Sequence, residues 1–182
     1  MIRRLKIISI AAILIVLIGS IYYIYTTERD NFHAITHGQA YRSAQLNKDE
    51  LEYYIKKYNI RSIINLRGEH PDEDWYIDEK LVSLKNNLQF YSLRLSSSRE
   101  PDYEDINKLI SIFKEAPRPV LIHCKAGADR SGLAAAIWKV VIDKEPKSIA
   151  KKQLSFFYGH LPFGKTSAMD RFFNKWNPPS DN

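Results

Sequence analysis

The chain has 182 residues, of which 45% are hydrophobic and 26% are charged, and its formal net charge is +6. These are the values of a globular protein, and the length suits one domain with a core plus a short extra segment. The positive charges are spread along the chain, so we predict no nucleic-acid partner. The single cysteine, Cys124, excludes an internal disulfide framework and a cysteine-rich metal site.

A run without charged residues spans residues 7–25, and three basic residues precede it. As a helix it would be about 28 Å long, which is enough to cross a bilayer core. The positive-inside rule then puts the N-terminus in the cytoplasm. A cleaved signal peptide is the competing interpretation, but the run contains no clear small-x-small cleavage site. We therefore predict a transmembrane signal anchor over residues 1–27 and a single-pass membrane protein. Its folded domain, residues 28–182, would be extracytoplasmic, on the periplasmic face of the inner membrane if the protein is bacterial.

Beyond this run, predicted strands and helices alternate. Short runs of apolar and β-branched residues indicate strands, and apolar residues at helical spacing indicate helices. Asn47 suits a helix N-cap, and Pro146 suits a first helical position. The predicted strands are residues 40–43, 60–66, 88–95 and 120–123, and the predicted helices are residues 48–58, 74–86, 103–115, 131–142, 146–158 and 167–176. This order predicts an α/β fold in which helices flank a largely parallel central sheet.

The chemistry is concentrated in residues 120–132, which read VLIHCKAGADRSG. The pattern predicts a strand, a tight loop and a helix start, so Cys124 would lie at the carboxyl edge of the sheet, where α/β proteins bind ligands. The N-terminus of the following helix favours an anion and lowers the pKa of a nearby thiol. The sequence therefore predicts a thiolate nucleophile beneath a bound phosphate.

The rest of the loop suits phosphate binding. Gly127 lets the backbone turn without a Cβ in the way. Arg130 suits bidentate binding of phosphoryl oxygens and of the transition-state charge. Ser131 is predicted to donate to the thiolate or to help expel it from a phosphocysteine. The backbone nest predicted to bind phosphate consists of Lys125, Ala126, Gly127, Ala128, Asp129 and Arg130.

The Cys124-x5-Arg130 loop, with His123 before it, resembles the signature of the cysteine-dependent protein tyrosine and dual-specificity phosphatases. Residues 31–43 and 63–67 further resemble the N-terminal half of the atypical dual-specificity phosphatases. The resemblance covers roughly residues 31–145. It implies the dual-specificity phosphatase fold and hydrolysis of phosphate monoesters in two steps, through a phosphocysteine, without a metal or another cofactor.

One departure from that family concerns the general acid. Most members place an aspartate on the loop before the helix that precedes the signature, but here residues 96–102 read SSSREPD. Glu100 and Asp102 are candidate acids, although Asp102 equally suits a helix cap. Asp129 is another candidate, because an aspartate just before the signature arginine is similar to the myotubularin and Sac phosphoinositide phosphatases. Alternatively, Asp129 only orients Arg130, or no protein group donates the proton.

Three basic residues outside the Cys–Arg pair are of interest. Lys125 either adds charge for a polyanionic substrate, as lysine does in lipid and inositide phosphatases, or is solvated. Arg42 and Arg67 lie near the ends of predicted strands, and each either lines the pocket or pairs with a carboxylate.

Three further side chains have structural interpretations. His123 is predicted to bond nearby backbone and hold the shape of the loop. Gln153 either orients the hydrolytic water or lies on an ordinary helix surface. His160 follows Gly159 and is interpreted as structural.

The leading hypothesis is thus a membrane-anchored cysteine phosphatase whose substrate is a phosphorylated protein, a phospholipid or an inositol phosphate. A phosphate-binding pseudophosphatase is a second class, but the intact Cys124, Arg130 and Ser131 argue against it. A rhodanese-type sulfur-transfer domain is a third, and the Arg-Ser-Gly exit from the loop argues against it.

Overall fold

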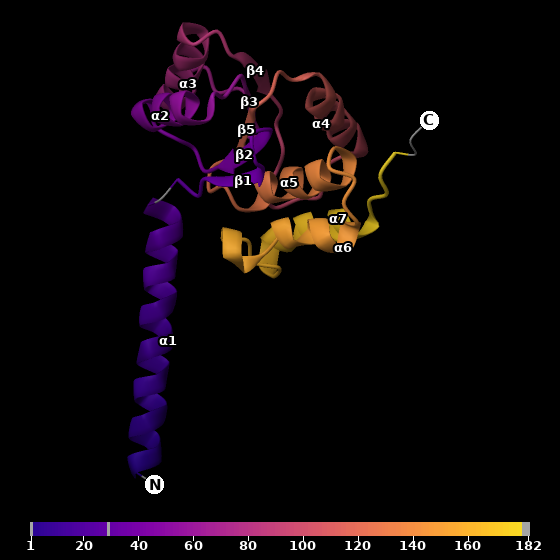
Figure 1. Cartoon of the computed structure of the whole chain (residues 1–182). Helices are drawn as coiled ribbons and strands as arrows, with labels where there is room; N and C mark the ends of the chain where they lie inside the picture. Colours follow the sequence, from indigo (N-terminus) through magenta and orange to yellow (C-terminus); the bar gives the residue numbers. More distant parts are fainter. Residues whose placement is uncertain (1, 29, 180–182) are drawn as a thin grey trace.

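The computed structural model describes residues 2–28 and 30–179, and within the first helix it describes the side chains of residues 7 and 9–21. A five-stranded sheet with the order β1-β2-β5-β3-β4 forms the centre of the fold (Figure 1). The strands are β1 (His33–Thr36), β2 (Ala40–Ser43), β3 (Ser62–Asn65), β4 (Gln89–Ser92) and β5 (Val120–His123). β1 is antiparallel to β2, and the other neighbours are parallel, so the sheet is mixed.

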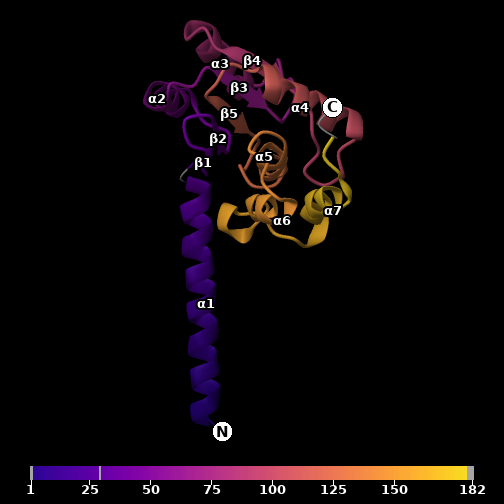
Figure 2. The ribbon, with the colours of Figure 1, turned by 45° about the vertical axis from the view of Figure 1, so that its right-hand side comes forward.

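Helices cover both faces of this sheet (Figures 1 and 2). One layer contains α2 (Lys48–Tyr58) and α3 (Asp74–Lys85). The other contains α4 (Tyr103–Glu115) and α5 (Asp129–Val141), and α6 (Lys147–Ala150) and α7 (Ala168–Lys175) pack on the outer side of α5. The α/β architecture predicted from the alternating pattern is therefore present.

The two faces of the sheet explain the apolar strand sequences. Side chains alternate across a strand, so Ile63 contributes to the core beneath α2 and α3, whereas Ile64 contributes to the core beneath α4 and α5. Leu121 and Ile122 of β5 divide in the same way. Central strands buried on both faces read as continuous apolar runs. This is why β5 was recognisable in the sequence.

Local signals placed α2 correctly. The Asn47 side chain accepts hydrogen bonds from the backbone N–H groups of Asp49 and Glu50, and Glu50 bonds back to the Asn47 N–H. This capping box satisfies donors that the first helical turn leaves unpaired. Asn59 ends the helix in the left-handed conformation, which asparagine adopts at helix C-termini more readily than most residues.

The predicted helix over residues 146–158 is wrong in its extent. α6 ends at Ala150 and is followed by short 3-10 turns at Lys151–Gln153 and Phe156–Tyr158. Regular helix is lost where the Gln153 backbone and side chain turn inward to accept hydrogen bonds from Arg42. Tertiary contacts thus override the local helix pattern.

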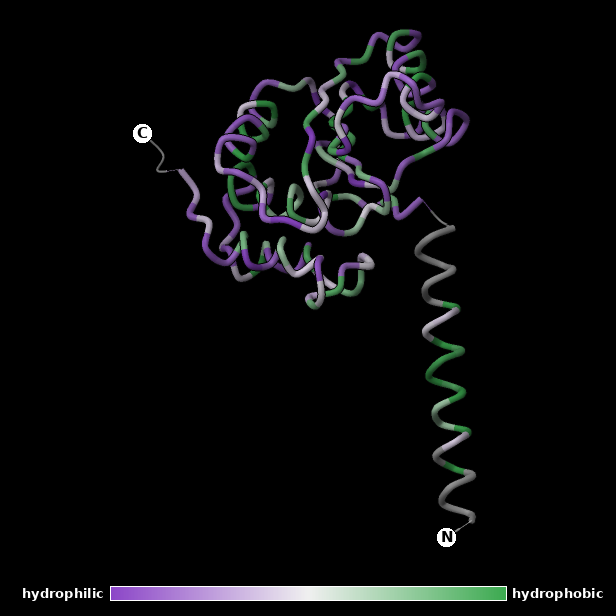
Figure 3. The backbone as a smooth tube through the Cα atoms, turned by 180° about the vertical axis from the view of Figure 1, so that it is seen from behind, coloured by the Kyte–Doolittle hydropathy of each residue, from purple (hydrophilic) through white to green (hydrophobic). Residues whose placement is uncertain are grey.

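The N-terminal helix corrects a second prediction. α1 (Ile2–Glu28) extends away from the sheet, and its central part is hydrophobic (Figure 3). A membrane-spanning helix needs about 20 consecutive apolar residues. Within the described part of the chain, no helix reaches the length and apolar character that crossing a membrane requires. The predicted transmembrane helix over residues 7–25 is therefore wrong, and with it the single-pass location with an extracytoplasmic domain.

Candidate active site

The signature loop connects β5 to α5 at the carboxyl edge of the sheet. α5 begins at Asp129, two residues before the predicted start. Cys124 is only 2% exposed, and its Sγ lies 3.5 Å from the Ser131 hydroxyl oxygen. A hydroxyl at this position stabilises a thiolate by donating to it. The thiol lies in a pocket of about 320 Å³ lined by Ala44, Ser97, Cys124, Lys125, Ala126, Asp129 and Arg130.

Four consecutive carbonyl groups of the loop are held from the N-terminal side of the fold. The Lys125 carbonyl accepts from the Gln45 backbone N–H at 3.2 Å, and the Ala126 carbonyl accepts from the Asn31 side chain at 3.0 Å. The Gly127 and Ala128 carbonyls accept from an Arg42 guanidinium nitrogen at 2.8 and 2.9 Å. These bonds fix the orientation of the loop peptides.

The N–H groups of the same peptides have no such partners. No hydrogen bond from the N–H groups of residues 125–130 to another described residue is present. A row of unpaired N–H groups that leads into a helix N-terminus is an anion-binding nest. The loop therefore has the geometry that a phosphate dianion requires.

Arg42 is positioned behind the loop and not in the pocket. Its side chain is fully buried, and it also donates to the backbone and side chain of Gln153 at 2.8 and 3.1 Å. The Tyr158 ring lies 4.6 Å from the guanidinium carbon. Burial lowers the pKa of Arg42 to about 10, so the residue is still charged at neutral pH. Arg42 thus supports the loop; it neither lines the pocket nor pairs with a carboxylate, the two alternatives predicted for it. Gln153 is a buried acceptor for Arg42 and does not lie on an ordinary helix surface.

Arg130 enters the pocket beside Cys124. Its Nη1 donates to the carbonyl oxygens of Leu66 and Leu95. Both hydrogen bonds are long, at 3.4 Å. Its Nε is buried and has no hydrogen-bond partner among the described residues. A buried unpaired donor in a pocket is unusual and indicates a ligand acceptor, here a phosphoryl oxygen.

Asp129 is the carboxylate that lines the pocket, among the residues that the structure describes. Its Oδ1 lies 2.7 Å from His160 Nδ1, and His160 Nε2 lies 2.7 Å from Asp170 Oδ2. His160 is fully buried between the two carboxylates. No local pattern in the sequence connects His160 with Asp129, because the two are far apart along the chain.

The other candidate acids lie outside the pocket. Glu100 pairs with Arg171 at 3.0 Å and Lys175 at 3.4 Å, and these hydrogen bonds lower the pKa of Glu100. Asp102 stands at the N-cap position of α4 without a side-chain capping bond, and it lines a neighbouring hollow with Glu100. From the same loop, Ser97 lines the Cys124 pocket.

His123 has a partner that the sequence analysis missed. Its Nε2 lies 2.6 Å from Glu79 Oε1, and both side chains are buried. Glu79 belongs to the buried face of α3 together with Tyr76 and Val82. A carboxylate at helical spacing among apolar residues was the signal for a buried partner.

Of two further cationic residues, Lys125 lines the pocket and Arg67 lies near Arg130. Lys125 is exposed. Arg67 stacks on Trp75, with its guanidinium carbon 3.5 Å from the ring centroid, and donates to Gln45 Oε1 at 3.0 Å. Burial lowers the pKa of Arg67, and the nearby charge of Arg130 lowers it further. The charges of Arg67 and Arg130 therefore influence each other.

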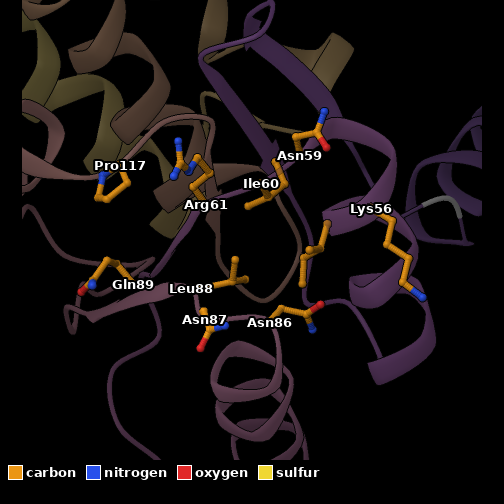
Figure 4. Close-up of a pocket in the computed structure, with 10 residues that line it drawn as sticks. Lys56, Asn59, Ile60, Arg61, Asn86, Asn87, Leu88, Gln89 and Pro117 are labelled. Atoms are coloured by element: carbon orange, nitrogen blue, oxygen red, sulfur yellow. The ribbon is translucent and has the colours of Figure 1, made fainter.

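A separate pocket of about 680 Å³ lies at the opposite edge of the sheet, where β3 and β4 begin (Figure 4). It has amide, lysine and arginine side chains but no carboxylate, histidine or cysteine. Its lining residues are Ile55, Lys56, Asn59, Ile60, Arg61, Asn86, Asn87, Leu88, Gln89 and Pro117. This pocket therefore lacks the nucleophilic side chain that the Cys124 pocket has. The described residues also contain no cluster of three or more His, Cys, Asp or Glu side chains suited to a metal ion.

Comparisons with known proteins agree with this geometry. Residues 17–168 match the model of a family described as a DSP-PTPase phosphatase fused to NAD+ kinase. The inositol diphosphatase SIW14 of Saccharomyces cerevisiae is 26% identical over 151 residues, which cover 79% of this chain and 50% of the yeast protein. The chain thus spans about half the length of this curated relative.

Solved structures show the same fold. The core catalytic domain of the PP-IP phosphatase SIW14 from S. cerevisiae, in complex with citrate, superposes with a TM-score of 0.64 at 19% identity and covers 81% of this chain and 85% of that chain. P. aeruginosa TpbA in complex with pTyr superposes with a TM-score of 0.61 at 20% identity and covers 80% and 84%.

Proposed function

This chain belongs to the family of DSP-PTPase phosphatases, and on that premise we propose that it removes phosphoryl groups from inositol phosphates, including diphosphates, through a phosphocysteine on Cys124. The chain is a cysteine-dependent phosphatase of the dual-specificity type, so the resemblance inferred from the signature loop is confirmed. The substrate and the roles of individual residues are the proposal.

One observation supports the mechanism above the others. The buried Cys124 thiol lies at one pocket with Arg130, Asp129 and the unpaired N–H groups of residues 125–130. Two-step phosphoryl transfer needs a nucleophile, a cation that binds the phosphoryl oxygens and a proton donor. The side chains all come from the short stretch of residues 124–130, at the junction of the loop and α5.

In the first step, the Cys124 thiolate attacks phosphorus and an S–P bond forms. The P–O bond to the leaving group breaks, and the leaving oxygen keeps the electron pair and takes a proton from Asp129. Arg130 and the backbone N–H groups bind the three remaining phosphoryl oxygens, whose charge is greatest in the transition state. In the second step, water attacks phosphorus, Asp129 accepts a proton from it, and the thiolate leaves toward the Ser131 hydroxyl.

Charge at the pocket rim favours a substrate with several phosphates. Lys125 lines the pocket, and Arg67 is near Arg130. The curated yeast relative is named an inositol diphosphatase. A diphosphate also has a phosphate as its leaving group, which needs less protonation than an alcohol. This suits a site in which Ser97 lies on the loop where the family resemblance implies an acid.

The test measures phosphate release from a diphosphoinositol polyphosphate, an inositol polyphosphate, a phosphotyrosine peptide and phosphatidylglycerol phosphate. We expect the highest kcat/KM for the diphosphoinositol compound. Cys124→Ser should abolish turnover of every substrate while it still binds them, because the pocket is retained. Preference for phosphatidylglycerol phosphate would reject the proposed substrate class, and activity in Cys124→Ser would reject the phosphocysteine.

Asp129→Asn tests the proton donor separately. We expect kcat to fall ~10²-fold or more with an aryl phosphate of high leaving-group pKa, and much less with a good leaving group. Equal losses with both would mean that Asp129 only orients Arg130. Asp72→Asn, on an exposed loop residue, is the matched control.

Phosphotyrosine is the second candidate substrate. Small residues, Ala44, Ser97 and Ala126, form part of the wall around Cys124, which leaves space for an aryl ring above the nucleophile. The structural neighbour TpbA was solved with pTyr. A higher kcat/KM for the phosphotyrosine peptide than for any inositol compound would favour this alternative.

A further inference from the structure

A buried histidine connects the pocket carboxylate to a second carboxylate that the substrate does not reach. His160 lies between Asp129 of α5 and Asp170 of α7, with 2.7 Å from each ring nitrogen to a carboxylate oxygen. Its side chain is fully buried, whereas those of the two aspartates are 18% and 14% exposed. The only one of the three that lines the Cys124 pocket is Asp129.

The two short contacts of the His160 ring require one more proton than a neutral imidazole and two ionised carboxylates carry. A neutral imidazole has one N–H and one lone pair, so it can donate to only one of two ionised carboxylates. Both nitrogens here are at hydrogen-bond distance from carboxylate oxygens. Either the imidazole carries two protons, or one carboxyl group is protonated. The three residues therefore hold a transferable proton.

The positions of the two aspartates favour the imidazolium form. Asp129 is the first residue of α5, and Asp170 is in the first turn of α7. Helix N-termini stabilise carboxylates in their ionised form. Burial lowers the pKa of His160, but the hydrogen bonds to Asp129 and Asp170 and their charges outweigh burial and raise it. These two carboxylates are the charged groups that raise the pKa of His160.

We propose that His160, held by Asp170, is a positioning residue that stores the proton which Asp129 delivers to the leaving group. This inference rests on the proposed role of Asp129. The proton moves from His160 Nδ1 to the Asp129 carboxylate and then to the leaving oxygen as the P–O bond breaks. The imidazole is left neutral, with its Nε2–H still bound to Asp170. In the second step, Asp129 takes a proton from the attacking water and returns it to Nδ1.

The test is the pH profile of kcat for phenyl phosphate, a substrate with a poor leaving group. In the wild type, kcat should fall as pH rises through the raised pKa of His160, because the stored proton is lost. Asp170→Asn keeps an acceptor for Nε2–H but removes a charge. Its alkaline limb should therefore move to lower pH by about one unit, with little change in kcat below the limb.

His160→Asn retains an amide N–H beside Asp129 but has no titratable proton. We expect the alkaline limb to disappear and kcat for phenyl phosphate to fall ~10²-fold, with a loss of at most about 3-fold for an aryl phosphate with a good leaving group. His37→Asn and Asp72→Asn, both at exposed positions, should behave as wild type.

A profile of Asp170→Asn that superposes on the wild-type profile would overturn the proposal. So would equal losses with both leaving groups in His160→Asn, since these indicate a structural role. Each variant is compared at a temperature below its own unfolding transition, so that a folding defect is not read as a catalytic one. Either result would overturn only the role of His160, because the wild type would still turn over substrate through Cys124. If the wild type showed no Cys124-dependent turnover, the proposed function itself would be rejected.

Discussion

An Arg42 guanidinium nitrogen lies 2.8 Å from the Gly127 carbonyl oxygen, and this hydrogen bond joins the second strand of the fold to the signature loop. The same nitrogen contacts the Ala128 carbonyl at 2.9 Å. A charged donor behind the loop draws the peptide oxygens away from the substrate side, where they would repel a phosphate. We therefore expect Arg42 to contribute to catalysis without contacting the substrate.

Replacing Arg42 tests this support. Arg42→Met keeps the side-chain length but removes every donor, so we expect kcat/KM for a small aryl phosphate to fall ~10²-fold. The free energy of unfolding should fall by about 3 kcal/mol, because several charge-assisted hydrogen bonds are lost. Initial rates of phosphate release measure kcat/KM, and urea denaturation measures the free energy of unfolding. The matched control, Arg61→Met, alters an exposed arginine at the opposite edge of the sheet. Wild-type kinetics in Arg42→Met would contradict the supporting role.

Gly127 is predicted to tolerate no side chain. Its φ is +68°, and a Cβ would lie 2.6 Å from the Ala44 backbone nitrogen. Gly38 has a similar φ of +71° but open space around the Cβ position, so Gly38→Ala measures the conformational cost alone. That cost is about 1 kcal/mol. We expect Gly38→Ala to lower Tm slightly and to leave kcat unchanged.

Gly127→Ala should lose at least ~10²-fold in kcat/KM, because the loop must move away from β2. Its Tm should fall further than that of Gly38→Ala, and thermal unfolding with a kinetic assay on both variants measures the difference. Equal effects in the two variants would show that close approach of the loop to β2 does not matter.

Local patterns were enough to predict the signature loop and the elements around it. Apolar runs indicate buried strands, Asn47 marks a helix start, and the Cys-x5-Arg spacing marks the phosphate site, because each depends on neighbours along the chain. These features placed Cys124 and Arg130 in one pocket, as the structure has them.

Partners that are distant in the sequence were not predictable in this way. Nothing near Asp129 indicates that His160 and Asp170 will contact it, since these contacts depend on how α7 packs against α5. The buried acceptor role of Gln153 likewise depends on Arg42, which is far away along the chain. For the hydrophobic N-terminal run, the local pattern predicted too much. Its composition suggested a membrane span that the described residues do not form.

Arg67 should distinguish substrates by their charge. It lies near Arg130 and is held by Trp75 and Gln45. We expect Arg67→Gln to raise KM for an inositol polyphosphate ~10-fold, because one charge-assisted contact with the substrate is lost. KM for p-nitrophenyl phosphate should change by less than about 2-fold, because one phosphate is already bound by the loop. Arg61→Gln should leave both KM values unchanged. Equal changes with both substrates would place Arg67 in the binding of the reacting phosphate.

His160 also predicts a pH dependence of stability. Its pKa in the folded protein is raised above its ordinary value of 6.5, because the hydrogen bonds to Asp129 and Asp170 outweigh the effect of burial. A group whose pKa rises on folding binds its proton more tightly in the native state. Its stabilising contribution is therefore complete below the unfolded pKa and is lost as pH rises through the folded pKa.

Urea denaturation at about pH 6 and about pH 9 measures this contribution. The wild type should lose more free energy of unfolding between the two pH values than His160→Asn, since the variant has no proton to lose at this position. His37→Asn is the matched control, because His37 is exposed on the turn between β1 and β2 and should keep the wild-type difference. If His160→Asn shows the same pH dependence as the wild type, the imidazole is not protonated between its two carboxylates. The free energy stored there would then come from neutral hydrogen bonds alone.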